Sequence, residues 1–146
     1  MNTARRSFFA AALVASFVAA SSFAPAALAQ AAPKNRIVIQ VSDNDPGKWN
    51  LALNNVGNLQ KDLGAGNVEI EVVAYGPGIG MLKMDSPVGN RIADALKSGV
   101  QVVACENTMA GQKLKKEDML VSIGYVKAGV IELMQKQQQG WAYLRP

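Results

Sequence analysis

The chain has no histidine and only one cysteine, Cys105, among its 146 residues. Without histidine, a single chain cannot form a Ser-His-Asp triad or a Cys-His dyad, and it lacks the commonest nitrogen ligand of zinc and copper sites. One cysteine also excludes an intramolecular disulfide. Any chemistry is therefore left to Cys105, carboxylates, lysines and the backbone, and we predict neither a metal nor a bound cofactor.

Long runs of like charge are absent as well. The chain has 15 basic and 11 acidic residues, but two of the basic ones, Arg5 and Arg6, belong to the amino-terminal leader considered next. The densest basic cluster, at residues 113–116, is followed at once by Glu117 and Asp118. A nucleic-acid-binding surface requires a sustained basic face, so we predict no nucleic-acid partner.

Residues 1–29 have the pattern of a cleavable signal peptide. Arg5 and Arg6 provide a positive amino-terminal region, and residues 7–28 carry no charge and are rich in alanine and larger apolar residues. The small residues that flank Leu28 favour cleavage after Ala29 and before Gln30.

A membrane anchor is the alternative interpretation, because a transmembrane helix needs about 20 strongly apolar residues. Serines and Pro25 interrupt this segment, which favours cleavage. The arginine pair resembles a twin-arginine signal, which exports folded proteins, but ordinary secretory signals also contain such pairs, so the export route stays open. We predict an exported, periplasmic protein whose residues 30–146 form one α/β domain with no membrane contact after cleavage.

Strands and helices are predicted to alternate after the leader. Strand-length runs rich in β-branched residues occur at 36–41, 68–74, 100–104, 121–126 and 141–144. Helical spacing of apolar residues predicts four helices. The first spans 46–63, the second begins at 86 and stops at 98–99, the third follows the strand end at 105 and runs through 114, and the fourth spans 128–139. This alternation indicates a three-layer α/β/α sandwich with a mainly parallel sheet of about five strands.

Two finer expectations concern burial. The strand at 68–74 alternates apolar residues with Glu69 and Glu71, which predicts one solvated face and a position near a sheet edge. The apolar residues of the helix at 128–139 are expected to face inward; they are Val130, Ile131, Leu133 and Met134.

Ligands of parallel sheets collect at the carboxyl ends of the strands, where three loops are expected to meet: 42–48, 75–82 and 105–108. Cys105 ends the most apolar strand, and Asn107 or Thr108 is the candidate N-cap of the helix that follows. Free N–H groups at a helix start lower the pKa of a thiol, whereas the adjacent Glu106 would raise it. Since free cysteines also pack as small apolar residues, both a reactive and a structural Cys105 stay open.

The other loop motifs have plainer explanations. Asp43 and Asp45 offer oxygen ligands for a hard cation, but acidic residues before a helix usually form turns and caps. The glycines at 76, 78 and 80 lack the ending of a P-loop and the spacing of a dinucleotide fingerprint. Turn geometry is favoured there, with backbone N–H groups that could hold an anion.

Three segments resemble the DsrE/DsrF-like family: residues 36–49, residues 72–78, and residues 99–108 with the sequence Ala-Cys-Glu-Asn-Thr at their end. The resemblance implies a three-layer α/β fold that assembles into trimers or hexamers. It also implies that Cys105 carries sulfur as a persulfide. In that role, we expect the helix start at Asn107 and Thr108 to stabilise the anion. The residues expected to shape this pocket are Asn44, Gly76, Gly78, Asn107 and Thr108.

Two functional hypotheses follow. In the first, Cys105 is a sulfurtransferase-like carrier that exchanges sulfur with a thiol-bearing donor or acceptor protein. In the second, the protein is a non-catalytic homo-oligomer that binds a small ligand or serves as an assembly module, and its cysteine is structural. The position of Cys105 favours the first, and the absence of a second, resolving cysteine favours the second.

Overall fold

The computed structural model describes residues 35–146, so the predicted leader and its cleavage position lie outside the described residues. Five strands form one parallel sheet in the order β4-β3-β2-β1-β5. Their bounds are β1 (Asn35–Val41), β2 (Val68–Ala74), β3 (Gln101–Cys105), β4 (Gly124–Val126) and β5 (Ala142–Leu144). The predicted α/β class and the approximate number of strands are confirmed.

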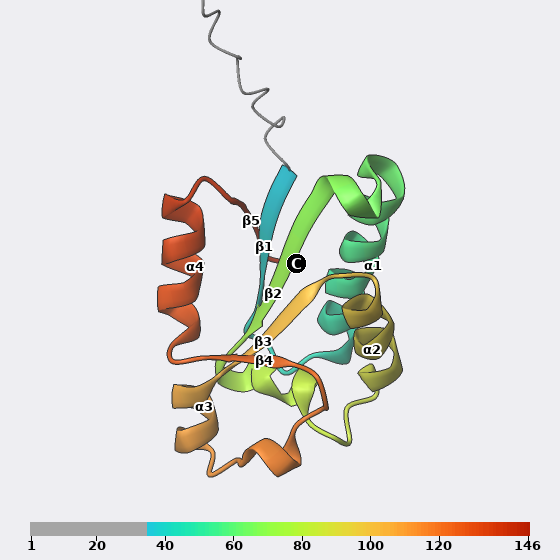
Figure 1. Ribbon diagram of the computed structural model, residues 1–146. Helices are drawn as coiled ribbons and strands as arrows, with labels where there is room; N and C mark the ends of the chain where they lie inside the picture. Colours follow the sequence, from blue (N-terminus) through green and yellow to red (C-terminus); the bar gives the residue numbers. More distant parts are fainter. Residues whose placement is uncertain (1–34) are drawn as a thin grey trace, which may run out of the picture. The chain divides into compact units, whose positions relative to one another are not determined.

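Helices cover both sides of this sheet. They are α1 (Pro46–Leu63), α2 (Gly89–Lys97), α3 (Glu106–Gly111) and α4 (Gly129–Gln138), with short 3-10 turns η1 (Ala65–Asn67), η2 (Gly76–Leu82) and η3 (Lys116–Asp118). Figure 1 draws α1 and α2 on one side of the sheet and α4 on the other, with α3 below α4 at the carboxyl ends of the strands. Within residues 35–146, no helix combines the length and apolar character needed to cross a membrane.

Helix α1 shows how local sequence sets an element. Asp45 caps its start by accepting hydrogen bonds from the backbone N–H groups of Gly47 and Lys48, and Pro46 occupies its first turn. Gly64 ends it at a φ of 84°, a conformation that favours glycine. The buried face packs in the larger core and contains Trp49, Ala52, Leu53 and Val56. Burial of each large side chain contributes about 1.5–3 kcal/mol.

The expectation that residues 68–74 lie at a sheet edge is wrong. β2 is the central strand and pairs with β1 on one side and β3 on the other. Glu71 is only 2% exposed, because α4 supplies a cation over it: Lys136 Nζ lies 2.6 Å from Glu71 Oε2. Glu71 therefore belongs to a buried ion pair under α4 and does not mark a solvated face.

The expected burial of α4 is also wrong at three of four positions. Leu133 is buried, but Val130 is 55% exposed, and Ile131 and Met134 are similarly exposed. From α4, the smaller core on this side of the sheet includes only Leu133, and the helix contacts β1, β2 and β5 there. The predicted strand at 121–126 shortens to Gly124–Val126, since Ser122 turns the chain with a φ of 66°.

Candidate functional site

Cys105 is the last residue of β3 and lies between two neighbouring strands. Ala104 pairs with Ala74 of β2, and Cys105 itself pairs with Val126 of β4. The segment after β2 leads to α2 on one side of the sheet, whereas β3 leads directly into α3 on the other side (Figure 1). Ligands of parallel sheets bind at the carboxyl ends of the strands. Cys105 lies at this position.

The sulfur of Cys105 caps helix α3. The backbone N–H of Thr108 donates to Cys105 Sγ at 3.4 Å, so Cys105 is the N-cap, in place of the predicted Asn107 or Thr108. On the side of β4, the carbonyl oxygen of Lys127 lies 4.0 Å from the sulfur. The residue is 5% exposed and forms no disulfide. Cys105 is thus enclosed by backbone groups from two segments.

These backbone groups shift the pKa of Cys105. Burial of the sulfur raises the pKa, but hydrogen bonds from the Thr108 hydroxyl and from the N–H groups of Gly129, Thr108 and Asn107 outweigh it and hold the pKa below its usual value. The N–H of Gly76 donates to Thr108 Oγ1 at 2.9 Å, which fixes the hydroxyl oxygen and leaves its proton for the sulfur. The arrangement stabilises a thiolate.

A fourth loop, residues 127–129, contributes to the site and was missed by the sequence analysis. The N–H of Asn107 donates to the carbonyl of Lys127 at 3.1 Å, which holds this loop against the start of α3. Gly129 begins α4 and is buried; a Cβ atom there would lie 2.9 Å from Cβ of Tyr75. The signal that could have revealed it is a glycine between a strand and a helix, at the same sheet edge as Cys105.

The predicted pocket residues divide into two groups. Hydrogen bonds connect Gly76, Thr108 and Asn107 to the surroundings of Cys105. Gly78 instead packs under the end of β1, where a side chain would overlap the Val41 carbonyl. Asn44 lies beside Gly80 in the loop after β1. Neither has a hydrogen bond that reaches Cys105.

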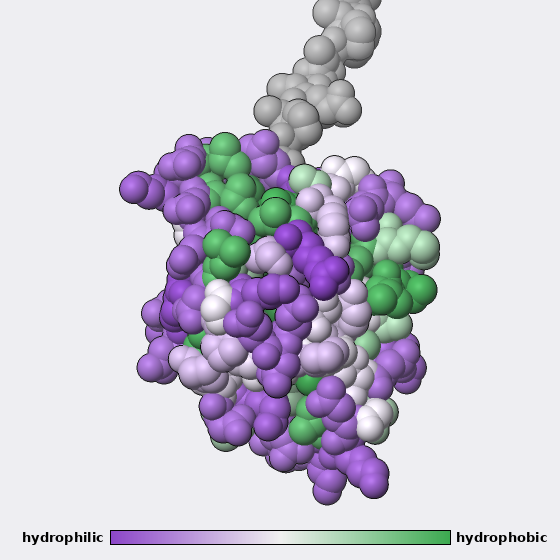
Figure 2. Space-filling model, turned by 180° about the vertical axis from the view of Figure 1, so that it is seen from behind, coloured by the Kyte–Doolittle hydropathy of each residue, from purple (hydrophilic) through white to green (hydrophobic). Residues whose placement is uncertain are grey.

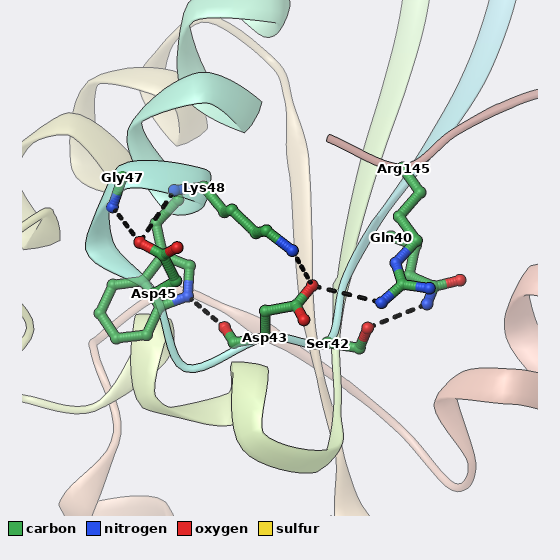
Figure 3. A network of polar contacts seen from close by, with 8 residues as sticks. Gln40, Ser42, Asp43, Asp45, Gly47, Lys48 and Arg145 are labelled. Atoms are coloured by element: carbon green, nitrogen blue, oxygen red, sulfur yellow. Dashed lines mark hydrogen bonds and ion pairs between the residues drawn. The ribbon is translucent and has the colours of Figure 1, made fainter.

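The acidic residues after β1 form structural contacts. Figure 3 shows Asp43 pointing toward two cations: its Oδ2 lies 3.2 Å from Lys48 Nζ and 3.3 Å from an Arg145 guanidinium nitrogen. The hydrogen bond from Lys48 chiefly holds the pKa of Asp43 below its usual value, with Arg145 acting in the same direction. Asp45 caps α1. Within residues 35–146, no three potential metal ligands cluster, and the turn-and-cap interpretation accounts for both carboxylates.

Residues 19–146 match the DsrE/DsrF-like family. A protein of unknown function from Methanobacterium thermoautotrophicum, MTH1491, is 34% identical with a TM-score of 0.74, over 77% of this chain and 100% of its own. No curated protein matches the chain.

Two further solved structures share the fold at lower identity. BT1422, a conserved protein of unknown function from Bacteroides thetaiotaomicron, is 17% identical with a TM-score of 0.64, over 77% of this chain and 95% of its own. The ychN protein from E. coli is 10% identical with a TM-score of 0.61, over 78% of this chain and 100% of its own. The fold, the position of Cys105 and the match over most of the sequence agree: the chain belongs to the DsrE/DsrF-like family.

Proposed function

We propose that this protein is a sulfur carrier that holds a sulfane sulfur as a persulfide on Cys105. The observation that carries the proposal is the lowered pKa of Cys105, produced by N–H groups from α3 and α4 together with the Thr108 hydroxyl. Only a thiolate attacks sulfane sulfur efficiently, and a persulfide anion needs the same hydrogen-bond donors as the thiolate that it replaces.

The exchange consists of two balanced steps. The Cys105 thiolate attacks the outer sulfur of a donor persulfide, R–S–SH; a sulfur–sulfur bond forms to Cys105, and the donor leaves as its thiolate. An acceptor thiolate then attacks the outer sulfur of the Cys105 persulfide and releases the Cys105 thiolate. One sulfur–sulfur bond breaks for each that forms, so the cycle consumes no oxidant and needs no second cysteine in this chain.

The cycle requires that the donor and the acceptor can reach the sulfur of Cys105. Because Cys105 is 5% exposed, a donor reaches Sγ only when α3 or the loop at 127–129 moves outward. Helix α3 has six residues, and it exposes Asn107 and Ala110 to solvent. Few buried contacts hold such a short element, which favours local opening.

The experiment is an intact-mass measurement on protein purified from its native compartment. After incubation with glutathione persulfide, the protein should gain one sulfur atom, and a thiol reductant should remove it. Cys105→Ser should gain none and keep its fold by circular dichroism. A mass that never changes, with Cys105 unreactive to alkylation until the protein is denatured, would contradict the proposal. The same spectrum tests export, because the mature chain should begin at Gln30.

The partners and location belong to the same proposal. We propose a homo-oligomer in the periplasm that exchanges sulfur with a thiol-bearing partner protein. Self-association is supported by large apolar side chains that residues 35–146 leave exposed; they include Leu51, Leu63, Met84 and Val121. Monomeric proteins seldom expose many such groups unless a surface binds something.

The burial of Cys105 supports a second candidate function, the non-catalytic ligand-binding or assembly module. A sulfur that caps a helix and packs at 5% exposure also fits a structural cysteine. Cys105→Ala separates the two candidates, because it abolishes sulfur loading in the first and leaves ligand affinity and assembly unchanged in the second.

A further inference from the structure

A groove of about 520 Å³ lies on the α4 side of the sheet. The sheet contributes Gln40 of β1, Tyr143 of β5 and Tyr75, which follows β2. Helix α4 forms the opposite wall with one stripe that includes Val130, Leu133 and Met134. The volume is within the range of small-molecule sites in proteins, roughly 300–1,000 Å³.

The groove exists because one helix covers this side of a five-stranded sheet. Leu133 is buried against the sheet, while Val130 and Met134 on the same stripe remain about half exposed at the rim. Figure 2, seen from behind, shows apolar atoms gathered at the right-hand edge, which corresponds to the α4 side of Figure 1. The part of the rim formed by Val130 and Met134 is therefore apolar, although it faces solvent.

Gln40 gives the groove a fixed polar group. Its side chain lies on the α4 face of β1 and is 8% exposed. Its Oε1 accepts from the Tyr143 hydroxyl at 2.6 Å, and its Nε2 donates to Ser42 Oγ at 3.0 Å. Two partners thus set the orientation of the amide, and the second hydrogen of Nε2 has no acceptor within residues 35–146. A buried donor of this kind is stabilised when an acceptor reaches it.

The charge of the lining defines the class of ligand. None of the lining residues is an aspartate, glutamate, lysine or arginine; beyond those named, the groove contains Gln137 and Gln138. A charged ligand would lose its hydration here without gaining a counter-charge. We propose that this groove binds a small, uncharged, mainly apolar molecule whose hydrogen-bond acceptor pairs with the Gln40 amide. The inference goes beyond the sulfur chemistry, because no atom of Cys105 lines the groove.

Fluorescence titration with prodan, a neutral naphthalene ketone, tests the proposal. Prodan emission should shift to the blue and saturate, and the anionic dye anilinonaphthalene sulfonate should bind at least about tenfold more weakly.

Val130→Glu places a charge at the rim and should weaken prodan binding by about tenfold or more. Ile131→Glu is the matched control: it is similarly exposed on α4 but lies outside the groove, and it should bind prodan like the wild type. Gln40→Leu should also weaken prodan binding, because it removes the donor.

Equal effects of Val130→Glu and Ile131→Glu would overturn the proposal, as would tighter binding of the anionic dye. Sedimentation equilibrium on the same samples identifies a different occupant. If wild-type protein does not bind prodan and Val130→Glu dissociates an oligomer, the groove is an interface between copies and the proposal is wrong. Cys105→Ser should bind prodan normally, so failure of the sulfur-carrier proposal remains distinguishable from failure of this one.

Discussion

At the scale of single residues, Thr108 connects two loops to the sulfur. It donates its own N–H to Cys105 Sγ, and its hydroxyl accepts from Gly76 while it donates to the same sulfur. The hydroxyl can be removed without loss of the backbone donor. Thr108 is therefore the residue through which the contribution of the side chain to the thiol pKa can be measured separately.

Thr108→Val should raise the pKa of Cys105 toward its usual value, because valine keeps the shape and removes the hydroxyl donor. The pH at which iodoacetamide alkylation reaches half its maximal rate should move upward. Thr108→Ser, which keeps a hydroxyl, should stay close to the wild type. An unchanged midpoint in Thr108→Val would show that the hydroxyl does not act on the sulfur.

The sign of the linked stability follows from the same pKa. Cys105 has a lower pKa in the folded protein than in the unfolded chain, so the folded state loses the proton first and gains stability as pH rises between the two pKa values. This gain should be smaller in Thr108→Val. Urea denaturation at several pH values between 6 and 9, a range about the usual thiol pKa, measures it.

At the scale of elements, close approach joins the start of α4 to the segment after β2. Gly129→Ala places a Cβ atom 2.9 Å from Tyr75 Cβ, so one of the two segments must shift. We expect a loss of about 1–3 kcal/mol in the free energy of unfolding and slower alkylation of Cys105, because the Gly129 N–H moves away from the sulfur.

Gly57→Ala is the control for this substitution. Gly57 is an exposed residue inside α1, and a Cβ atom there meets nothing within 4 Å. Alanine at such a position should stabilise the protein by about 0.5–1 kcal/mol. If urea denaturation gives the two variants the same sign, crowding at Tyr75 is not what constrains Gly129.

The ion pair between β2 and α4 is the second contact between elements. Lys136 lies 2.6 Å from Glu71 Oε2, and its ammonium also lies 4.3 Å above the Trp141 ring. Burial raises the pKa of Glu71 above its usual value, and Lys136 opposes this increase. The carboxylate therefore depends on a cation that another element supplies.

Lys136→Met should lower the free energy of unfolding by about 3–5 kcal/mol at neutral pH, because it leaves a buried carboxylate without a partner. Since the folded-state pKa of Glu71 is raised, its ionisation reduces stability as pH rises through that pKa, and the cost of Lys136→Met should shrink on acidification. The double variant Glu71→Leu with Lys136→Met should recover most of the loss. A cost independent of pH in chemical denaturation would contradict this account.

At the scale of the whole molecule, the prediction concerns assembly. Large apolar side chains remain exposed on several elements of residues 35–146, including Met84 in the segment before α2 and Val121 before β4. Excess charge, which would oppose association, is small in this chain, with 15 basic and 11 acidic residues. Sedimentation equilibrium should give the mass of a trimer or hexamer, and a monomer at all concentrations would contradict the prediction.

Much of the fold and part of the site were predictable because their signals are local. β-branched runs, helical spacing and the cap formed by Asp45 and Pro46 act within a few residues, so the alternation of elements and the start of α1 followed from the sequence. The position of Cys105 at a strand end followed for the same reason. The exposure of Val130 could not be predicted from the sequence, because it depends on how much of the sheet a single helix covers.

Local sequence patterns were enough to predict an α/β fold, the place of Cys105 at the carboxyl edge and the lack of any histidine-based chemistry. That β2 is central, and that the start of α4 at Gly129 helps to lower the pKa of Cys105, depend on how the elements pack. The physical reason is distance along the chain: Glu71 and Lys136 are 65 residues apart and meet only when α4 packs over β2. Local patterns set the elements, whereas contacts between distant segments decide which charges are buried and lower the pKa of the Cys105 thiol.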